Sequence, residues 1–205
     1  MADVQFVWLD AMGVIFASAD DVRELLLPFA RLHGSVSSDE EIVGLYRDCS
    51  RGCFSSAELW CRLGVSGDPS SLDDDHLAAH RLTPGIVEFA RAAARAGIGV
   101  GCVSNDISEW ARWLRARHGL DPYITPWLTS GDLKMRKPDP AMYERIREIG
   151  GRSASACLVV DDREANLDAA KALGFATVRF GAASERHASV ADAREMASLL
   201  LERSR

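Results

Sequence analysis

Residues 4–10, Val-Gln-Phe-Val-Trp-Leu-Asp, form a short apolar run that ends at a carboxylate. This length is typical of a buried strand rather than of a helix. Similar runs occur at residues 98–103, 124–128, 157–160 and 176–180, and stretches of helical periodicity separate them. Strands that alternate with helices pair in parallel through right-handed crossovers, and the helices cover both faces of the sheet. The sequence therefore predicts a three-layer α/β fold around a Rossmann-like parallel sheet.

The segment between the first two predicted strands shows helical patterns and no strand pattern. Apolar side chains at helical spacing mark its first helix: Val22, Leu25, Leu26, Phe29 and Leu32. Pro28 should kink or break this helix, and residues 65–75, rich in Gly, Ser, Pro and Asp, are expected to form a loop. We expect an α-helical cap at residues 17–82, inserted into a core domain of residues 1–16 and 83–205. The helices expected in that core span residues 84–96, 108–118, 140–149, 165–173 and 189–202.

The composition excludes several functional classes. The chain has 205 residues, 47% hydrophobic and 26% charged, with a net charge of −6. There is no block of Lys and Arg, so we expect neither a nucleic acid nor an anionic membrane as partner. The N-terminus resembles no signal peptide, and no apolar run is long enough to span a bilayer, which indicates a cytoplasmic protein. The five cysteines match no zinc pattern and are expected to be reduced; no feature indicates an oligomer interface.

Polar residues with chemical potential follow the predicted strands. Asp10 ends the first strand, Ser104-Asn105 the second, and Asp161-Asp162 the fourth, while Lys137 lies beyond the third. Each feature alone is ordinary, since a strand-end Asp is most often a turn residue or a helix cap. Ligands in parallel sheets bind at the carboxyl ends of the strands, where these residues converge. Their occurrence together therefore predicts a functional site.

The chemistry of that set is coherent. Three crowded carboxylates raise one another's pKa unless a cation neutralises them, and Mg²⁺ favours such oxygen ligands together with a substrate phosphate. Lys137 adds a positive charge, and Ser104 can donate to the oxygens of a transferring phosphoryl group. Asp10 can then attack phosphorus, and water can release the resulting aspartyl-phosphate.

Four stretches resemble the haloacid dehalogenase superfamily along nearly the whole chain. They are Trp8-Leu9-Asp10-Ala11-Met12-Gly13-Val14, Val103-Ser104-Asn105, Arg136-Lys137-Pro138-Asp139-Pro140 and Val159-Val160-Asp161-Asp162. The helical insertion is similar to the small cap of subgroup I of that family. Together with residues 130–135, Ser-Gly-Asp-Leu-Lys-Met, the motifs are most similar to the branch of sugar-1-phosphate phosphatases and the N-terminal phosphatase domain of epoxide hydrolases.

The resemblance implies a Mg²⁺-dependent phosphatase that acts on a small phosphorylated metabolite through an aspartyl-phosphate intermediate. The implied catalytic residues are Asp10, Ser104 and Lys137; the implied substrate-binding residues are Ser104, Asn105 and Lys137; the implied metal ligands are Asp10, Met12, Asp161 and Asp162. Met12 contributes its backbone carbonyl in this assignment, and the Asp161-Asp162 pair holds Mg²⁺ directly or through water.

Met12 departs from the family pattern. Phosphatases of the family usually carry a second Asp there as the general acid and base, and losing such a group typically costs about 10²–10⁴ in rate. One interpretation is a phosphatase for substrates with good leaving groups, such as acyl phosphates or sugar 1-phosphates. The alternatives are a hydrolytic dehalogenase and a catalytically inactive protein that binds a phosphorylated ligand or a partner. Asp106, beside Ser104-Asn105, is a candidate replacement for the missing acid, but a cap of the helix at residues 108–118 is the favoured interpretation.

Other polar residues are harder to interpret from the sequence. His76 and His80 are four residues apart, and we expect them on a solvated helix face. Trp110 and Trp113 have the spacing of core residues on a helix. In the cap, where this family sets its substrate preference, the candidate substrate contacts are Tyr46, Arg47, Arg51 and Trp60. The sequence does not select among these four, and it does not identify the substrate.

Overall fold

A computed structural model describes residues 4–201 of the chain. Its centre is a sheet of six strands in the order β3-β2-β1-β4-β5-β6, and all neighbouring strands are parallel. The strands are β1 (Phe6–Leu9), β2 (Gly99–Ser104), β3 (Trp127–Thr129), β4 (Cys157–Asp161), β5 (Ala176–Phe180) and β6 (Ala188–Val190). The predicted α/β class with a parallel sheet is therefore confirmed. No helix among the described residues is both long and apolar enough to cross a membrane.

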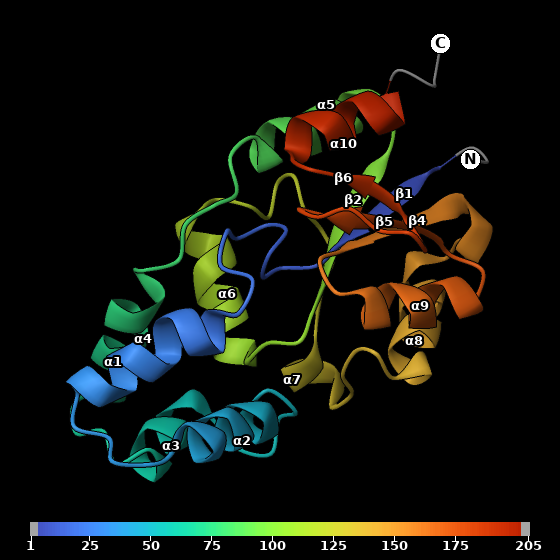
Figure 1. Ribbon diagram of the computed structural model, residues 1–205. Helices are drawn as coiled ribbons and strands as arrows, with labels where there is room; N and C mark the ends of the chain where they lie inside the picture. The colour runs from blue at the N-terminus through green and yellow to red at the C-terminus, as the bar shows by residue number, and fades with distance from the viewer. Residues whose placement is uncertain (1–3, 202–205) are drawn as a thin grey trace.

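The two faces of the sheet carry separate hydrophobic cores because side chains alternate along each strand. In β1, Val7 and Leu9 belong to one core, whereas Phe6 and Trp8 belong to the other. The helices α5 (Ile86–Arg95), α6 (Ser108–Arg117) and α10 (Ala193–Leu201) contribute to the first core. The helices α8 (Pro140–Gly150) and α9 (Glu164–Ala172) cover the second. Figure 1 shows the resulting layers, with α5 and α10 above the sheet and α8 and α9 below it.

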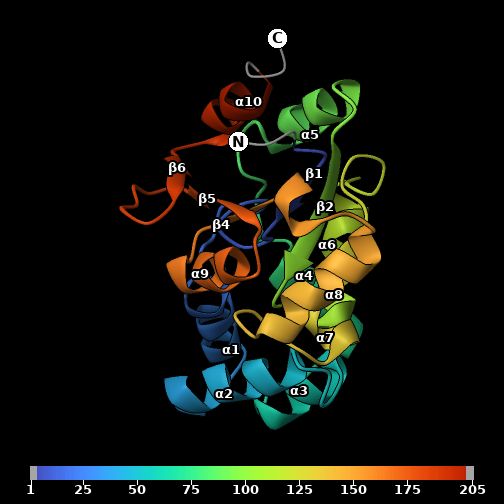
Figure 2. The same cartoon turned by 90° about the vertical axis from the view of Figure 1, so that its right-hand side faces the viewer.

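All regular structure between β1 and β2, up to the start of α5, is helical. It consists of a π-helix, η1 (Val22–Leu26), followed by α1 (Leu27–Leu32), α2 (Asp39–Cys49), α3 (Ser56–Arg62) and α4 (Pro69–Leu77). Pro28 lies in the first turn of α1, so it marks the break between η1 and α1. Ser38 and Glu41 form a reciprocal capping box at the start of α2. These helices lie together beside the sheet in both views (Figures 1 and 2).

The two chain segments that lead into and out of this insertion lie side by side. The N–H of Ala17 donates to the carbonyl of Arg81, and the N–H of Thr83 donates to the carbonyl of Ile15, both at 2.9 Å. Phe16 and Leu82 form an antiparallel bridge between the same two segments. The insertion therefore leaves the core and returns to it at one point.

One carboxylate joins the insertion to the core helix α6. Asp73 of α4 accepts hydrogen bonds from Ser56 Oγ (2.7 Å) and Trp60 Nε1 (2.8 Å) of α3, and from Trp110 Nε1 (2.6 Å) of α6. The indole nitrogens of two buried tryptophans are thereby satisfied, as buried N–H donors need to be. The expected core position of Trp110 is confirmed, because this side chain is 1% exposed.

Three sequence-based expectations about elements were wrong. Residues 65–75 do not form a loop throughout, because Asp68 caps α4 and Pro69 occupies its first turn, where proline is well tolerated. The last expected helix, residues 189–202, is interrupted: β6 comes first and α10 begins at Ala193. The strand expected at residues 124–128 is limited to β3. A short edge strand such as β6 has too few residues to show a period, and residues 202–205 lie outside the described residues.

The expectation that His76 and His80 lie on a solvated helix face was also wrong. Each of these residues is 1% exposed, and both imidazole rings pack against aromatic side chains. The ring centroids of His76 and Trp110 are 4.7 Å apart, and His80 lies near Phe16. The polar sequence of α4 concealed which of its faces docks onto α6, because that choice depends on tertiary packing. Burial lowers the pKa of His76 to about 3 and that of His80 to about 4, so both rings are neutral near pH 7.

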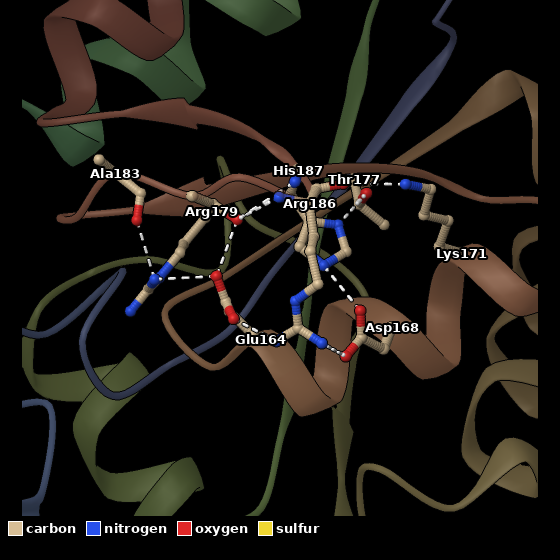
Figure 3. Close-up of polar contacts among 9 residues, drawn as sticks. Glu164, Asp168, Lys171, Thr177, Arg179, Ala183, Arg186 and His187 are labelled. Atoms are coloured by element: carbon tan, nitrogen blue, oxygen red, sulfur yellow. Dashed lines mark hydrogen bonds and ion pairs between the residues drawn. The ribbon is translucent and has the colours of Figure 1, made fainter.

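On the opposite side of the molecule, an ionic network ties α9 to β5 and to the segment before β6 (Figure 3). We call it the α9–β5 network and define it by four charged residues: Glu164, Asp168, Arg179 and Arg186. Glu164 pairs with both arginines, and Arg186 also pairs with Asp168. Two guanidinium groups thus face two carboxylates at the protein surface. His187 extends the network by bridging Asp168 and Thr177 at 3.0 and 2.9 Å.

Candidate active site

The carboxyl ends of the central strands bring the predicted site residues together. Asp10 directly follows β1, and its N–H donates to the carbonyl of Val160 in β4, at 2.9 Å, so it lies beside Asp161. Lys137 reaches this point from the segment between β3 and α8. Its Nζ atom lies 2.8 Å from Asp10 Oδ1 and 2.7 Å from Asp161 Oδ2. With Asp162 these residues form what we call the strand-end cluster, one ammonium group among three carboxylates.

Asn105 holds the backbone that carries Lys137. Its Nδ2 donates to the Lys137 carbonyl, and its Oδ1 accepts from the Lys137 N–H, both at 2.8 Å. This pair of bonds fixes where the Lys137 side chain starts, so Asn105 positions the ammonium group. Because both ends of the amide are engaged, the observed contacts of Asn105 are with the protein backbone. Its predicted contact with phosphoryl oxygens stays a prediction.

Asp161 is fully buried and its two oxygens are already well supplied with donors. Besides Lys137, Asn166 Nδ2 donates to both oxygens at 3.0 Å, and the N–H of Arg163 donates to Oδ1 at 2.9 Å. Asn166 was not singled out from the sequence. The only available signal was its place five residues after Asp161, in the first turn of α9. Asp161 therefore acts as an anchor for Lys137 and for the start of α9.

Asp162 differs from Asp161 because one of its oxygens lacks a partner. Its Oδ1 atom is buried and accepts no hydrogen bond. Gly13 lies against the other oxygen: its φ is +80°, and a Cβ atom added there would come within 2.7 Å of Asp162 Oδ2. Only a residue without a side chain permits this approach, which brings the Met12-Gly13 backbone close to the carboxylate. A buried carboxylate oxygen without a donor is costly, and a cation ligand would satisfy it.

The electrostatics of the cluster favour a bound cation. Burial, reinforced by Asp161, raises the pKa of Asp10 well above its usual value, although Lys137 opposes the shift. Burial and Asp161 likewise raise the pKa of Asp162 to about 6. Burial disfavours the charge on Lys137, but the carboxylates of Asp10 and Asp161 outweigh it and raise the pKa, so the amine stays protonated. Lys137 and the nearby Arg163 offset the negative charge of the three carboxylates only in part.

The geometry fits a hard divalent ion. Ligand oxygens of Asp10, Asp161 and Asp162 all lie within 4.8 Å of one another. Oxygen-only donor sets of this kind are typical of Mg²⁺ sites, in which one or two carboxylates share the ion with water and substrate phosphate. The unpartnered oxygen and the excess negative charge are both accounted for by such an ion.

A cavity of about 180 Å³ opens above the cluster, between the strand ends and the helical insertion. Four predicted site residues line it: Asp10, Met12, Ser104 and Asn105. The other three, Lys137, Asp161 and Asp162, are not part of its lining. Of the four candidate cap contacts, Tyr46 and Arg47 line the cavity, whereas Arg51 and Trp60 do not. A volume of this size suits a small molecule rather than a polymer.

The cavity contains groups that sequence reasoning missed. Arg23, Arg136 and Arg163 line it together with Arg47, so four guanidinium groups belong to the cavity lining. Asp21, which precedes η1, also lines it. Asp21, Arg23 and Arg47 belong to the insertion, which the fold brings to the strand ends. Arg136 lies at a motif position to which no role was given, and Arg163 directly follows the Asp161-Asp162 motif.

Asp106 does not lie where it could replace the missing general acid. It is 1% exposed and absent from the cavity lining, and its carboxylate accepts a hydrogen bond from the N–H of Ile107 at 2.7 Å. Nor does its side chain cap α6, because Ile107 occupies the N-cap position. Both ideas about Asp106 therefore lack structural support.

Comparisons with known proteins point to one family of hydrolases. Residues 57–174 match the family model for haloacid dehalogenase-like hydrolases. A phosphoglycolate phosphatase from Pseudomonas fluorescens is 27% identical over 85% of this chain and 68% of its own length. The chain spans between 35% and 68% of the lengths of its curated relatives.

Two solved structures share the fold. One is a HAD family enzyme from Bacteroides thetaiotaomicron, solved in complex with magnesium and inorganic phosphate. It has a TM-score of 0.74 and 18% identity, and covers 89% of this chain and 96% of its own. The other is the L-2-haloacid dehalogenase from Xanthobacter autotrophicus, with a TM-score of 0.67 and 16% identity over 96% of this chain and 98% of its own. At these identities the two structures support the fold alone.

Proposed function

The chain belongs to the haloacid dehalogenase-like hydrolase family, and on this premise we propose that it is a Mg²⁺-dependent phosphatase that forms an aspartyl-phosphate on Asp10. The observation that carries the proposal is the strand-end cluster: a buried carboxylate paired with Lys137, beside a carboxylate oxygen that lacks a donor. The cavity above it offers hydrogen-bond donors and cations to a phosphorylated ligand.

The residues of the site have the following roles in this proposal. Asp10 attacks phosphorus, because its carboxylate both lines the cavity and is held by Lys137. Ser104, at the end of β2, donates to a phosphoryl oxygen, and Asn105 keeps Lys137 in place. Water then attacks the aspartyl-phosphate and releases inorganic phosphate.

Mg²⁺ would be held by Asp10, Asp162 and the backbone carbonyl of Met12, with Asp161 contributing through water. The unpartnered oxygen makes Asp162 the direct ligand of the pair, since the Asp161 oxygens already accept several hydrogen bonds. When bound, the ion supplies charge neutralisation for the carboxylates and for the phosphoryl oxygens.

The arginines favour a substrate with a second acidic group. Arg47 and Arg136 line the cavity, and among the described residues neither forms an ion pair with a carboxylate. Guanidinium groups of this kind pair well with a carboxylate or a second phosphate. The relative from Pseudomonas fluorescens is named for phosphoglycolate, a phosphorylated short hydroxy acid. We therefore propose this substrate class, with phosphoglycolate as its smallest member to test.

We also propose that residues 17–82 serve as a cap over a core of residues 1–16 and 83–205, of which residues 1–3 and 202–205 lie outside the described residues. The helices η1 to α4 and the paired linkers support this division. Within the family, we propose that the chain belongs to the branch of sugar-1-phosphate phosphatases and epoxide hydrolase phosphatase domains, which the resemblance of its motif residues supports.

The test is phosphate release from a panel of small phosphate esters: phosphoglycolate, glucose 1-phosphate, ethyl phosphate and acetyl phosphate, each with Mg²⁺ and with EDTA. Asp10→Asn should reduce turnover by about 10⁴-fold or more, as loss of a nucleophile does. Arg47→Ala should raise KM for phosphoglycolate by about 10-fold, the effect of one lost charged hydrogen bond, and leave that for ethyl phosphate unchanged. Arg51→Ala, outside the cavity lining, is the matched control.

The two alternatives make different predictions in the same assay. A dehalogenase releases halide from 2-chloropropionate in EDTA and no phosphate from the panel. A catalytically inactive binding protein retains phosphoglycolate in a calorimeter but turns over neither kind of substrate. Either result would replace the phosphatase proposal.

A further inference from the structure

We propose that Asp21, from the helical insertion, is the proton donor and acceptor that Met12 cannot be. This inference rests on the proposed phosphatase function and adds a catalytic residue to it. The usual position two residues after the nucleophile holds a thioether, which transfers no proton, so an alkyl phosphate needs its acid from elsewhere.

The position of Asp21 is the first argument. It lines the same cavity of about 180 Å³ as Asp10 and Met12, on the side formed by the insertion. In a space of this size, a phosphorylated molecule attacked by Asp10 has its leaving group within reach of the cavity wall. Asp21 is also 7% exposed, so bulk water does not compete for its proton.

The second argument is that neither a capping hydrogen bond nor an ion pair explains why a carboxyl group is buried at position 21. It occupies the N-cap position of η1, yet its side chain makes no capping hydrogen bond. Among residues 4–201 it forms no ion pair. Arg163 and nearby backbone N–H groups stabilise its carboxylate, but by less than burial destabilises it. A buried carboxyl group that is compensated only in part is unfavourable, and polar groups of this kind are concentrated at functional sites.

The surroundings keep a large fraction of Asp21 protonated near neutral pH. Burial, followed by the charge of Asp20, raises the pKa of Asp21 to about 7, and Arg163 opposes the shift. The other charged or titratable groups nearby are Tyr46 and Asp106, which also sense the Asp21 charge, and the cavity arginines Arg47 and Arg136. A general acid works best when its pKa lies near the working pH.

The other cavity groups are less suited to this role. The Tyr46 hydroxyl donates to the carbonyl of Asn105 at 3.2 Å, and burial raises its pKa well above 10. Asp20 is 45% exposed at its side chain and pairs with Arg23 at 3.5 Å. The arginines do not give up a proton under ordinary conditions. Asp21 is therefore the group with both the place and the acidity.

The proposed steps balance. As an oxygen of Asp10 bonds to phosphorus, the ester P–O bond breaks, and the leaving alkoxide takes the proton of Asp21 to become an alcohol. Asp21 is then a carboxylate. It takes a proton from the water that attacks the aspartyl-phosphate, which yields inorganic phosphate, free Asp10 and protonated Asp21.

The experiment compares two leaving groups in one protein preparation. Acetyl phosphate releases acetate, which needs no proton, whereas an alkyl phosphate releases an alkoxide. For Asp21→Asn, kcat/KM should fall by about 10²–10⁴ on the alkyl phosphate that the wild-type protein cleaves fastest, and by less than about 10-fold on acetyl phosphate. The ratio of the two values does not depend on how much of the variant is folded.

Asp48→Asn is the matched control, because it removes an exposed carboxylate of the insertion that does not line the cavity and should leave the ratio of the two kcat/KM values unchanged. If Asp21→Asn lowers both values equally, or neither, while wild-type turnover still depends on Asp10, the role of Asp21 is overturned and the phosphatase proposal stands. If the wild-type protein releases no phosphate from any ester, both proposals fall together.

Discussion

The strand-end cluster and the α9–β5 network both consist of four charged residues, yet their environments make them opposites. In the cluster, one ammonium group faces three carboxylates, and Lys137 and Asp161 are almost completely buried. In the network, two guanidinium groups face two carboxylates, and the Arg186 side chain is 53% exposed. Hydrogen bonds from Arg186 and Ser184 lower the pKa of Glu164 to about 2, whereas burial raises the pKa values of Asp10 and Asp162 in the cluster. Balanced charges at the surface stabilise the local structure, whereas unbalanced charges in the interior favour binding of a counter-ion.

The largest difference in stability loss between the two regions should appear when a lysine is replaced. Lys137→Met takes the only ammonium group from the cluster and leaves its carboxylates uncompensated, which should cost about 3–5 kcal/mol of unfolding free energy. Urea unfolding in EDTA measures this loss, and added Mg²⁺ should recover part of it. Lys171→Met, which removes one hydrogen bond from an exposed lysine to the carbonyl of Arg186, should cost less than about 1 kcal/mol. Equal losses for the two variants would contradict the contrast.

A smaller effect, with opposite signs in the two regions, should follow from neutralising one carboxylate. Asp162→Asn removes an uncompensated negative charge, so the metal-free protein should gain about 1 kcal/mol at pH 7.5 after allowance for solvent screening. The sign follows because a raised pKa means that ionisation of Asp162 opposes folding above pH 6. The same variant should lose its response to Mg²⁺, which for the wild type is about 2.7 kcal/mol at an ion concentration 100 times Kd.

Asp168→Asn is the matched variant in the network, where it removes a partner of Arg186 and His187. It should lower Tm slightly and leave the Mg²⁺ response intact, as thermal unfolding with Mg²⁺ and with EDTA can show. A gain of stability for Asp168→Asn, or a loss for metal-free Asp162→Asn, would mean that the two regions do not differ in charge balance.

A further expected effect concerns buried groups that carry no charge at all. The unfolded chain takes up protons at histidine near pH 6.5, but folded His76 does so only near pH 3 and folded His80 near pH 4. The unfolded state therefore binds more protons between these values, and stability falls as the pH drops from 6.5 towards 4. His76→Phe should remove about 2 kcal/mol of that pH dependence between pH 7 and 4.5, measured by urea unfolding. An unchanged pH dependence would show that His76 is charged in the folded protein.

The part of the site that could be predicted from the sequence is the part fixed by strand order. Asp10, Ser104 and Asp161 follow buried strands directly, so any parallel sheet brings them to one edge. The fold class followed from the same alternation. Lys137 lies beyond the third strand rather than at its end, so strand order indicated its place less directly, and the resemblance of its surrounding motif to a family supported it.

The parts that could not be predicted depend on contacts between distant segments. The bonds between Asn105 and the Lys137 backbone, and the place of Asp21 in the cavity, require two pieces of chain to meet, and no local pattern encodes that meeting. The misjudged face of α4 has the same cause. The sequence favoured a solvated face for His76, yet Asp73 of the same helix accepts hydrogen bonds from the indoles of Trp60 and Trp110, and His76 is buried beside them.

The paired linkers at Ala17 and Arg81 have a consequence for how such a protein can change over generations. The insertion begins and ends at hydrogen-bonded neighbours, so its two ends meet the core as the two ends of a tight turn would. The entropic cost of closing such a loop rises only slowly with its length. A whole insert can therefore be lengthened, shortened or exchanged by recombination without disturbing the strand ends. With Asp21 inside the insert and Asp10 outside it, such an exchange would replace the proton donor together with the substrate contacts, so leaving-group preference and substrate choice would be inherited as one unit.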